Sequence, residues 1–368
     1  MQIKTIGIIG GGQLGMMMTE AAHDLGFKVV VLDPTPNSSC GQIAEKQIIA
    51  EYGDIAQIET LCRQSDVITY EFENVPYQVI ENFQKDYNIP QGFKPLYFSQ
   101  HRIREKCAAE QAGVLCGNYR AVNNRNDLET AVREIGFPCV LKTCSGGYDG
   151  KGQLVLKRET DLNDAVPLLA HECILEKFIP FDYEISVIVT RSITGEMTLM
   201  PTGKNIHKDN ILFMTVHPSH LPPVVEKKAS EIAQNIMNNL DIVGTMAIEL
   251  FVVGDEVYFN EMAPRPHNSG HYSIEACHTS QFEQHIRAIT GMPLGNTALK
   301  CRSAIMVNVL GQHYEGMQRL KQECRPQVYV HDYGKGEARR NRKMGHVTFI
   351  DYDLETVENM VENYFEAV

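Results

Sequence analysis

The chain has 368 residues, of which 43% are hydrophobic and 22% are charged, and its formal net charge is −12. This length allows two or three packed subdomains, and the acidic balance argues against a general binder of nucleic acid or of membrane surfaces. The ten cysteines are scattered without a CxxC pair, which predicts free thiols in a cytoplasmic protein rather than a zinc cluster or a disulfide framework. The apolar run at the start is too short for a signal peptide or a membrane span, so we expect no membrane partner.

The first 98 residues alternate between apolar strands and helices. Residues 3–9, 28–32 and 66–70 have the composition of buried strands, and a glycine turn at 10–15 precedes a helix that reaches about residue 25. This alternation favours a parallel α/β sheet with helices on both faces. We therefore expect a Rossmann-like N-terminal domain over residues 1–98.

Gly10, Gly12 and Gly15 match the G-x-G-x-x-G pattern of dinucleotide-binding sites, and Asp33 stands at the end of the next strand. Glycine amides at a helix N-terminus bind any phosphate or carboxylate, however. The pattern leaves open a dinucleotide site, a bare structural turn and an anion site for another phosphorylated ligand. We favour the last of these.

The central region, residues 99–295, opens with an expected helix over 101–112. Residues 139–144 and the QLVLK segment after the loop read as a hairpin, whose tip is the glycine-rich segment 145–152, inside a small α+β module of about 110–172. No GK[ST] closes this loop onto a helix, so it is not a Walker A loop. Because Lys142 and Lys151 flank the glycines, we interpret it as a lid over a triphosphate rather than an ordinary hairpin tip.

The rest of the central region is expected to be a larger antiparallel sheet. Residues 173–191 read as an edge-to-core strand pair bent at Pro180, and helices at about 226–239 and 273–290 should cover the sheet. A C-terminal module over 296–368 should consist of strands and a closing helix. Its basic run, 339–343, indicates a phosphate pocket, with a solvated face as the alternative.

The segment Glu249–Gly270 carries the densest chemistry. Two apolar runs joined at Gly254-Asp255 carry Glu249 and Glu261, and two carboxylates on neighbouring strands provide the hard oxygen ligands that Mg²⁺ prefers. A two-residue loop places Glu249 opposite Asn260, a three-residue loop places it opposite Glu261, and a bulge brings all three to the ion.

Two further groups of polar residues flank apolar or proline-rich positions. Arg265, His267 and Asn268 follow the second glutamate directly, and we expect them to handle a phosphorylated, anionic intermediate. Glu176 and Glu184 bracket the apolar pair at 178–179. That arrangement suits an adenosine clamp, although an edge strand with surface charges has the same pattern.

Together these segments resemble the ATP-grasp superfamily, and within it the ligases that carboxylate 5-aminoimidazole ribonucleotide in purine biosynthesis. The resemblance covers nearly the whole chain. It rests on GGGQLG at 10–15, YEFENV at 70–75, SGGYDGKG at 145–152, EKFIPFDYEISV at 176–187, EMAPRPHNSGH at 261–271, and the tail with Lys335, Arg342 and Lys343.

The resemblance implies an ATP-grasp fold that combines α/β and α+β parts, in a cytoplasmic homodimer. ATP would lie between the small module and the larger sheet, with Mg²⁺ on Glu249 and Glu261. The implied ATP-binding residues are Arg102, Lys142, Gly147, Tyr148, Asp149, Gly150, Lys151, Gly152, Gln153, Glu176, Lys177, Phe178, Ile179, Glu184, His207, Asn260 and Glu261.

By the same resemblance, bicarbonate is activated as carboxyphosphate and 5-aminoimidazole ribonucleotide is the acceptor. The implied residues for this substrate are Gly11, Gly12, Gln13, Leu14, Glu73, Lys335 and Arg342. Tyr148 and Asp149 would close over the intermediate that Arg265, His267 and Asn268 stabilise.

Two alternatives stay open. A formate-using glycinamide ribonucleotide transformylase is similar at the metal hairpin, but typically shows RPHDTG where this chain has RPHNSG at 265–270. An NAD-dependent oxidoreductase, from another enzyme class, would rest on the glycine pattern and on Asp33.

Overall fold

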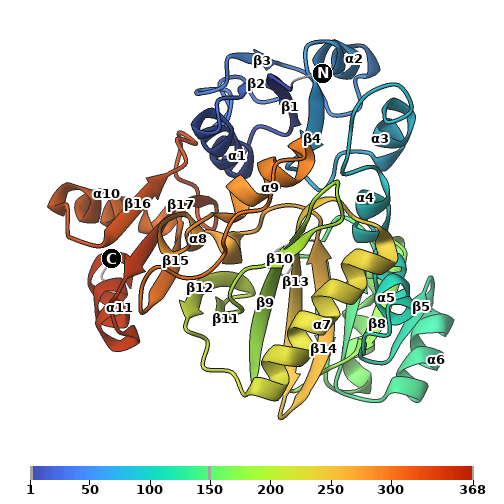
Figure 1. Ribbon diagram of the computed structural model, residues 1–368. Helices are drawn as coiled ribbons and strands as arrows, with labels where there is room; N and C mark the ends of the chain where they lie inside the picture. The colour runs from blue at the N-terminus through green and yellow to red at the C-terminus, as the bar shows by residue number, and fades with distance from the viewer. Residues whose placement is uncertain (1–2, 148–150, 367–368) are drawn as a thin grey trace.

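The structure is a computed structural model that describes residues 3–147 and 151–366 (Figure 1). Tyr148, Asp149 and Gly150, which carry part of the expected lid, lie outside the described residues. Within the described ranges no helix is long and apolar enough to cross a membrane. All ten cysteines are free, as their spacing predicts.

The N-terminal sheet is parallel, as predicted, with the strand order β3-β2-β1-β4. Its strands are β1 (Thr5–Ile9), β2 (Lys28–Leu32), β3 (Lys46–Ile48) and β4 (Val67–Tyr70). Helices α2 (Ile55–Arg63), α3 (Tyr77–Phe83) and α4 (Lys94–Ser99) pack their apolar side chains against one face.

The opposite face of this sheet is covered by α1 (Gln13–Asp24) together with α9 (Gln281–Thr290), a helix from far along the chain. Figure 1 shows α9 directly beside α1 and β4. The prediction of helices on both faces is confirmed. One of those helices, however, comes from outside residues 1–98.

The large sheet has nine strands, and all its pairs are antiparallel. Along its path the order is β14-β13-β9-β11-β12-β15-β17-β16, and β10 pairs with β9. The strands are β9 (Tyr183–Arg191), β10 (Met197–Leu199), β11 (Gly203–Lys208), β12 (Ile211–His217), β13 (Gly244–Val253), β14 (Glu256–Ala263), β15 (Ala304–Leu310), β16 (Val328–Asp332) and β17 (Lys343–Ile350). The C-terminal strands therefore extend the central sheet.

Helices pack on both the central and the C-terminal parts of the large sheet. The long helix α7 (Pro223–Leu240) and helix α5 (Arg102–Gln111) bury their apolar sides against β9, β13 and β14. Helices α10 (Tyr314–Glu323) and α11 (Leu354–Val361) pack on β15 and β17.

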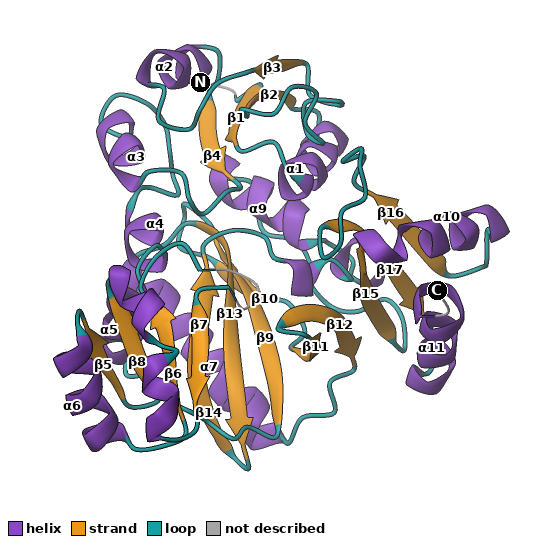
Figure 2. Cartoon of the chain, turned by 180° about the vertical axis from the view of Figure 1, so that it is seen from behind, coloured by secondary structure: helices purple, strands orange, loops and turns teal. Residues whose placement is uncertain are grey.

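A second, four-stranded antiparallel sheet forms the small module, in the order β5-β8-β6-β7. It consists of β5 (Tyr119–Val122), β6 (Cys139–Thr143), β7 (Gln153–Leu156) and β8 (Cys173–Lys177), with α6 (Arg125–Ile135) packed on it. Figure 2 shows this module beside the large sheet. The predicted hairpin with the glycine-rich tip is β6–β7.

Two expectations about the central region are wrong. Residues 173–191 do not form a strand pair, because β8 and β9 lie in different sheets and the segment around Pro180 crosses between them. The expected helix over 273–290 is two helices, α8 (Ser273–Ala276) and α9, because Ser280 caps a new N-terminus by accepting a hydrogen bond from the amide of Glu283 at 3.1 Å.

Candidate active site

The carboxylate hairpin is formed by β13 and β14. Val253 pairs with Glu256, so the loop has two residues, and this register continues to Leu250 opposite Phe259. A β-bulge then leaves Asn260 as the extra residue and places Glu249 opposite Glu261. Residues directly opposite each other on an antiparallel pair share one face. The bulge therefore reconciles the two-residue loop with a facing pair of glutamates.

The surroundings give these two carboxylates different proton affinities. Desolvation and the charge of Glu261 raise the pKa of Glu249 above its ordinary value. Desolvation also acts against ionised Glu261, but Arg102 and Lys142 outweigh it and lower the pKa of that carboxyl. Arg102 reaches it at 3.3 Å between Nη1 and Oε2. A hard divalent cation fits this pair, because it binds oxygen ligands and its charge would favour ionisation of Glu249.

The turn after the hairpin brings the predicted Arg/His/Asn group to this pair. Nε2 of His267 lies 3.6 Å from Oε1 of Glu249, and Arg265 forms a 2.7 Å ion pair with Glu73. Oδ1 of Asn268 is buried and has no hydrogen-bond partner among the described residues. Gln281, at the start of α9, holds the turn by accepting from the amide of His267 at 2.9 Å and donating to its carbonyl at 2.7 Å.

His267 is neutral in this setting. Desolvation and the nearby charge of Arg265 bring the pKa of its imidazole well below the ordinary value. The backbone amide of Ser269 donates to Nδ1 at 3.4 Å. Because an amide N–H only donates, we assign Nδ1 as the acceptor and place the ring proton on Nε2, toward Glu249.

The expected nucleotide residues form one ion pair within the small sheet and one within the large sheet. Lys142 contacts Glu176 at 2.9 Å, and Nδ1 of His207 lies 2.6 Å from Glu184. Desolvation opposes ionisation of Glu176, but Lys106 and Lys142 lower the pKa of its carboxyl to about 2. Desolvation lowers and Glu184 raises the pKa of His207, and the net change is upward. Glu176, which was assigned to adenosine, thus contacts Lys142, a cation assigned to phosphate.

The apolar pair at 178–179 stands where β8 leaves the small sheet. The amide of Phe178 donates to the carbonyl of Pro138 at 3.3 Å, and the side chain of Ile179 lies against Gly117. The ammonium of Lys177 donates to the carbonyl of Ile135 at 3.4 Å, away from the Lys142–Glu176 pair. The structure does not bring the Lys177 ammonium to the carboxylate hairpin.

The described part of the glycine loop closes tightly on the end of β6. Gly152 has φ +72°, and a Cβ there would meet Oγ1 of Thr143 at 2.7 Å, so glycine is required. A Cβ at Gly147 would lie 2.9 Å from the carbonyl of Lys151 and 3.7 Å from the guanidinium of Arg102. Gln153 pairs with Lys142 across the hairpin. The described residues of this loop that were expected to bind ATP therefore lie next to one another at the end of β6.

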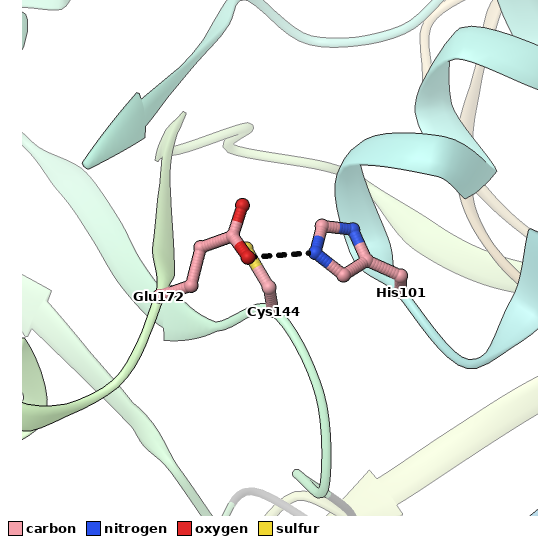
Figure 3. Close-up of side chains that lie close together, drawn as sticks. All are labelled: His101, Cys144 and Glu172. Atoms are coloured by element: carbon pink, nitrogen blue, oxygen red, sulfur yellow. Dashed lines mark hydrogen bonds and ion pairs between the residues drawn. The ribbon is translucent and has the colours of Figure 1, made fainter. Parts of the chain in front are cut away.

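His101, Cys144 and Glu172 lie together at the base of this loop (Figure 3). Their donor atoms are within 4.8 Å of one another, but Nε2 of His101 and Oε2 of Glu172 already pair at 3.1 Å. Desolvation raises the pKa of the Cys144 thiol to about 12, which keeps it protonated. We interpret the cluster as a contact that fastens the start of α5 to the small sheet.

The glycine turn of the N-terminal domain is already occupied by carboxylates of the same chain. The amide of Gly11 donates to Asp33 at 2.7 Å, and the amide of Gly12 donates to Glu71 at 2.8 Å. Asp33 also accepts from the hydroxyl of Tyr52 at 2.7 Å. Two of the amides that would bind a dinucleotide phosphate are therefore engaged, and so is the carboxylate that would hold its ribose.

The other residues expected for the second substrate surround this turn. Desolvation lowers the pKa of Lys335 to about 8, against the attraction of Glu71. Lys335 donates to the carbonyl of Lys343 at 2.9 Å, and Arg342 donates to the carbonyl of Lys335 at 3.1 Å. Gln13 begins α1, whereas the side chain of Leu14 is buried in the core.

The basic run at 339–343 does not form one pocket. The exposed Arg339 pairs with Glu337 at 3.0 Å, and both side chains are 72% exposed. Arg342, in contrast, turns back to the backbone carbonyls of Lys335 and Glu337. The interpretation as a phosphate pocket fails for Arg339, whose guanidinium has a solvated carboxylate partner instead.

Two residues that the sequence reasoning missed touch the hairpin directly. Glu105 accepts a hydrogen bond from the amide of Met262 at 2.6 Å, and Lys106 donates to the carbonyls of Phe259 and Asn260. Both are ionisable residues buried on α5, where desolvation raises the pKa of the Glu105 carboxyl to about 8. Their spacing from Arg102, at i+3 and i+4 of one helix, was the available signal.

Three family models match successive parts of the chain. They are the ribonucleotide synthetase preATP-grasp domain over residues 3–100, the ATP-grasp domain over 107–282, and the phosphoribosylaminoimidazole carboxylase C-terminal domain over 304–360. Together these matches account for most of the described structure.

Known proteins resemble the chain over nearly its full length. The N5-carboxyaminoimidazole ribonucleotide synthase of Bacillus subtilis is 46% identical over 347 residues, which cover 94% of this chain and 91% of that protein. The Staphylococcus aureus N5-carboxyaminoimidazole synthetase, solved with ADP, has a TM-score of 0.94 at 39% identity and covers 99% of this chain and 98% of that one.

A fungal structure shows both ligands of such an enzyme. The N5-carboxyaminoimidazole synthase of Aspergillus clavatus, in complex with ADP and 5-aminoimidazole ribonucleotide, has a TM-score of 0.90 at 27% identity and covers 99% of this chain and 98% of that one. The expected ATP-grasp fold is confirmed by these similarities. The chain belongs to the N5-carboxyaminoimidazole ribonucleotide synthase family of ATP-grasp ligases.

Proposed function

We propose that this protein is an ADP-forming carbon–nitrogen ligase that carboxylates the exocyclic amine of 5-aminoimidazole ribonucleotide with ATP and bicarbonate. The supporting observation is the position of Glu249 and Glu261, which face each other between the Arg102–Lys142 cations and the Arg265–Glu73 pair. The two carboxylates therefore join the cations proposed to bind phosphate to Glu73, the N-terminal residue proposed to bind the ribonucleotide.

The reaction has three steps with balanced atoms. A bicarbonate oxygen attacks the γ-phosphorus of ATP, so that carboxyphosphate forms and ADP leaves. Carboxyphosphate then breaks its carbon–oxygen bond to give carbon dioxide and phosphate. The amine of the ribonucleotide attacks carbon dioxide, a carbon–nitrogen bond forms, and one amine proton is released.

The residues on the nucleotide side bind and orient ATP in this scheme. Arg102 and Lys142 contact the phosphate oxygens, and Glu184 with His207 holds the nucleoside. Glu249 and Glu261 would hold Mg²⁺, which when bound supplies positive charge to the phosphoryl oxygens. Their exclusively oxygen donors suit that ion.

The turn at 265–268 handles the intermediate. Arg265 places a guanidinium beside the hairpin while its partner Glu73 faces the ribonucleotide. The buried Oδ1 of Asn268 is positioned to accept a hydrogen bond from the amine. Because His267 carries its proton on Nε2, it orients Glu249 and does not act as base, and the released phosphate takes the amine proton.

The glycine loop 145–152 closes over this site, because an open site would lose carboxyphosphate to water. Lys335 and Arg342 bind the 5′-phosphate of the ribonucleotide, and the turn at 10–15 binds its ribose. We extend the proposal to a cytoplasmic homodimer, which light scattering coupled to size exclusion tests.

A coupled assay of ADP release tests the function. Release that requires bicarbonate together with 5-aminoimidazole ribonucleotide supports the proposal. Release that instead requires formate and glycinamide ribonucleotide contradicts it in favour of the transformylase. Titration with NADH distinguishes the oxidoreductase, which predicts tight nicotinamide binding and no binding of ATP.

A further inference from the structure

The bulge at Asn260 is contacted from one side by a single turn of α5. Nζ of Lys106 donates to the carbonyl of Phe259 at 3.2 Å and to the carbonyl of Asn260 at 2.9 Å. Glu105 accepts from the amide of Met262 at 2.6 Å. Four consecutive residues, 259–262, therefore have partners on this one helical turn, since Arg102 pairs with Glu261.

These contacts stabilise the point at which the strand register changes. Without the bulge, the ladder that begins at Val253 and Glu256 would place Asn260, and not Glu261, opposite Glu249. A bulged residue leaves backbone groups outside the ladder, and such buried groups need another partner. The ammonium of Lys106, with a side chain only 4% exposed, supplies that partner.

Lys106 also joins this bulge to the nucleotide side. Its Nζ lies 3.8 Å from Oε1 of Glu176, while Lys142 contacts the other carboxylate oxygen at 2.9 Å. The ammonium also lies 5.3 Å from the ring centre of Phe259, which has its own place in the core. One buried cation thus fixes the backbone beside Glu261 relative to the carboxylate assigned to adenosine.

We propose that Glu105 and Lys106 are positioning residues, which hold the bulge at Asn260 and so keep Glu261 opposite Glu249 for metal binding. The proposal rests on the proposed function insofar as the two glutamates bind the cation. Both residues act through their hydrogen bonds to the backbone of β14.

The hairpin offers a matched control at its other end. Lys228 donates to the carbonyl of Asp255 at 2.9 Å and pairs with Glu256 at 2.8 Å. Like Lys106, it donates to a backbone carbonyl of this hairpin and pairs with a carboxylate, but it does so far from the bulge. Lys228→Met should lower thermal stability slightly and leave metal binding unchanged.

The test is a titration of Mn²⁺, followed by electron paramagnetic resonance, into protein saturated with ADP. Lys106→Met and Glu105→Ala should weaken Mn²⁺ binding by about tenfold or more, the usual effect of removing a residue that positions a metal ligand. Glu105→Gln keeps an oxygen that accepts from Met262 and should restore binding to within about twofold of the wild type. Calorimetry of ADP binding without metal measures the part of the Lys106→Met effect that comes from the lost contact with Glu176.

Unchanged Mn²⁺ affinity in Lys106→Met or Glu105→Ala would overturn the proposal, and so would an equal loss in Lys228→Met. If Lys106→Met does not fold, the comparison of Glu105→Ala with Glu105→Gln decides the question. Failure of the proposed function is a separate result, because it appears as wild-type protein that binds Mn²⁺ but releases no ADP with bicarbonate and 5-aminoimidazole ribonucleotide.

Discussion

The nucleotide side and the ribonucleotide side of the site satisfy their charged groups in different ways. On the nucleotide side, cations pair with carboxylate side chains, as in Lys142–Glu176 within the small sheet and Arg102–Glu261 between α5 and β14. On the ribonucleotide side, the carboxylates of Asp33 and Glu71 bind backbone amides instead. Lys335 is then left with a carbonyl at 2.9 Å as its hydrogen-bond acceptor.

This difference determines which existing interactions each ligand must alter when it binds. An incoming triphosphate must share cations that already have partners, so the ion pairs act as a preformed frame for it. An incoming monophosphate relieves the cost of a buried ammonium, whose pKa desolvation lowers to about 8. The two sides should therefore respond to substitution and to pH in different ways.

The largest expected effect is at the junction of the two sides. Glu261→Ala should reduce turnover by at least about a thousandfold, since the charge that a bound metal supplies to the phosphoryl group amounts to several kcal/mol. The fold should persist, because the side chain of Glu261 is 44% exposed and its removal leaves no cavity in the core. ADP release and a thermal melt measure the two quantities.

Glu256→Ala is the matched control, because Glu256 is an exposed carboxylate on the same strand. It should retain turnover. A large fall in the melting temperature of Glu261→Ala, without a specific loss of turnover at lower temperature, would identify Glu261 as structural and remove it from the comparison.

The next effect isolates the ribonucleotide side. Lys335→Ala should raise the KM for 5-aminoimidazole ribonucleotide by about 10- to 100-fold, which corresponds to a charged hydrogen bond of about 1.5–3 kcal/mol. The KM for ATP should change by less than about twofold. Arg339→Ala, in the same loop but with a solvated partner, should change neither constant. An equal rise of both KM values in Lys335→Ala would show that Lys335 acts on both ligands and that the two sides are not independent.

Much of this arrangement follows from sequence, because it depends on local patterns. The individual strands of the N-terminal sheet, the β6–β7 hairpin and the segment that carries Glu261 and His267 each appear as a pattern within about twenty residues. Of the three stated arrangements, the three-residue loop and the bulge both brought Glu261 to Glu249. The structure selects the bulge, which no loop length could indicate.

The rest depends on partners far apart in the chain. Lys106 reaches the carbonyl of Asn260 across 154 residues, and Gln91 donates to the carbonyl of Pro264 across 173. The face of the N-terminal sheet that α9 covers is a similar case. Periodicity shows that such residues are buried, but the identity of the partner is a tertiary property.

A smaller effect should appear in the pH dependence of the ribonucleotide side. The charge of Lys335 is present below its pKa of about 8 and is lost as the pH rises through that value. The kcat/KM for 5-aminoimidazole ribonucleotide should therefore fall above about pH 8. In Lys335→Arg the guanidinium stays charged, so the fall should move to higher pH. The same alkaline fall in both proteins would assign the titration to another group.

The smallest effect should be a pH dependence of stability that comes from Glu249, a carboxyl whose ionisation creates charge as the pH rises. The pKa of Glu249 is raised by desolvation and by Glu261, so the folded protein holds a proton that the unfolded chain, with a carboxyl pKa of about 4.3, has already released near pH 6. The native state then binds more protons than the unfolded state, and the metal-free protein should lose stability as the pH rises toward neutrality and above. We expect a melting temperature that falls by a few degrees over this range in the wild type and falls less steeply in Glu249→Gln, where the carboxyl of Glu105, whose pKa desolvation raises to about 8, still contributes. A wild-type melting temperature that rises over the range would contradict this account of Glu249. Raising the pH thus ionises Glu249, which a bound cation requires, and neutralises Lys335, which a bound anion requires.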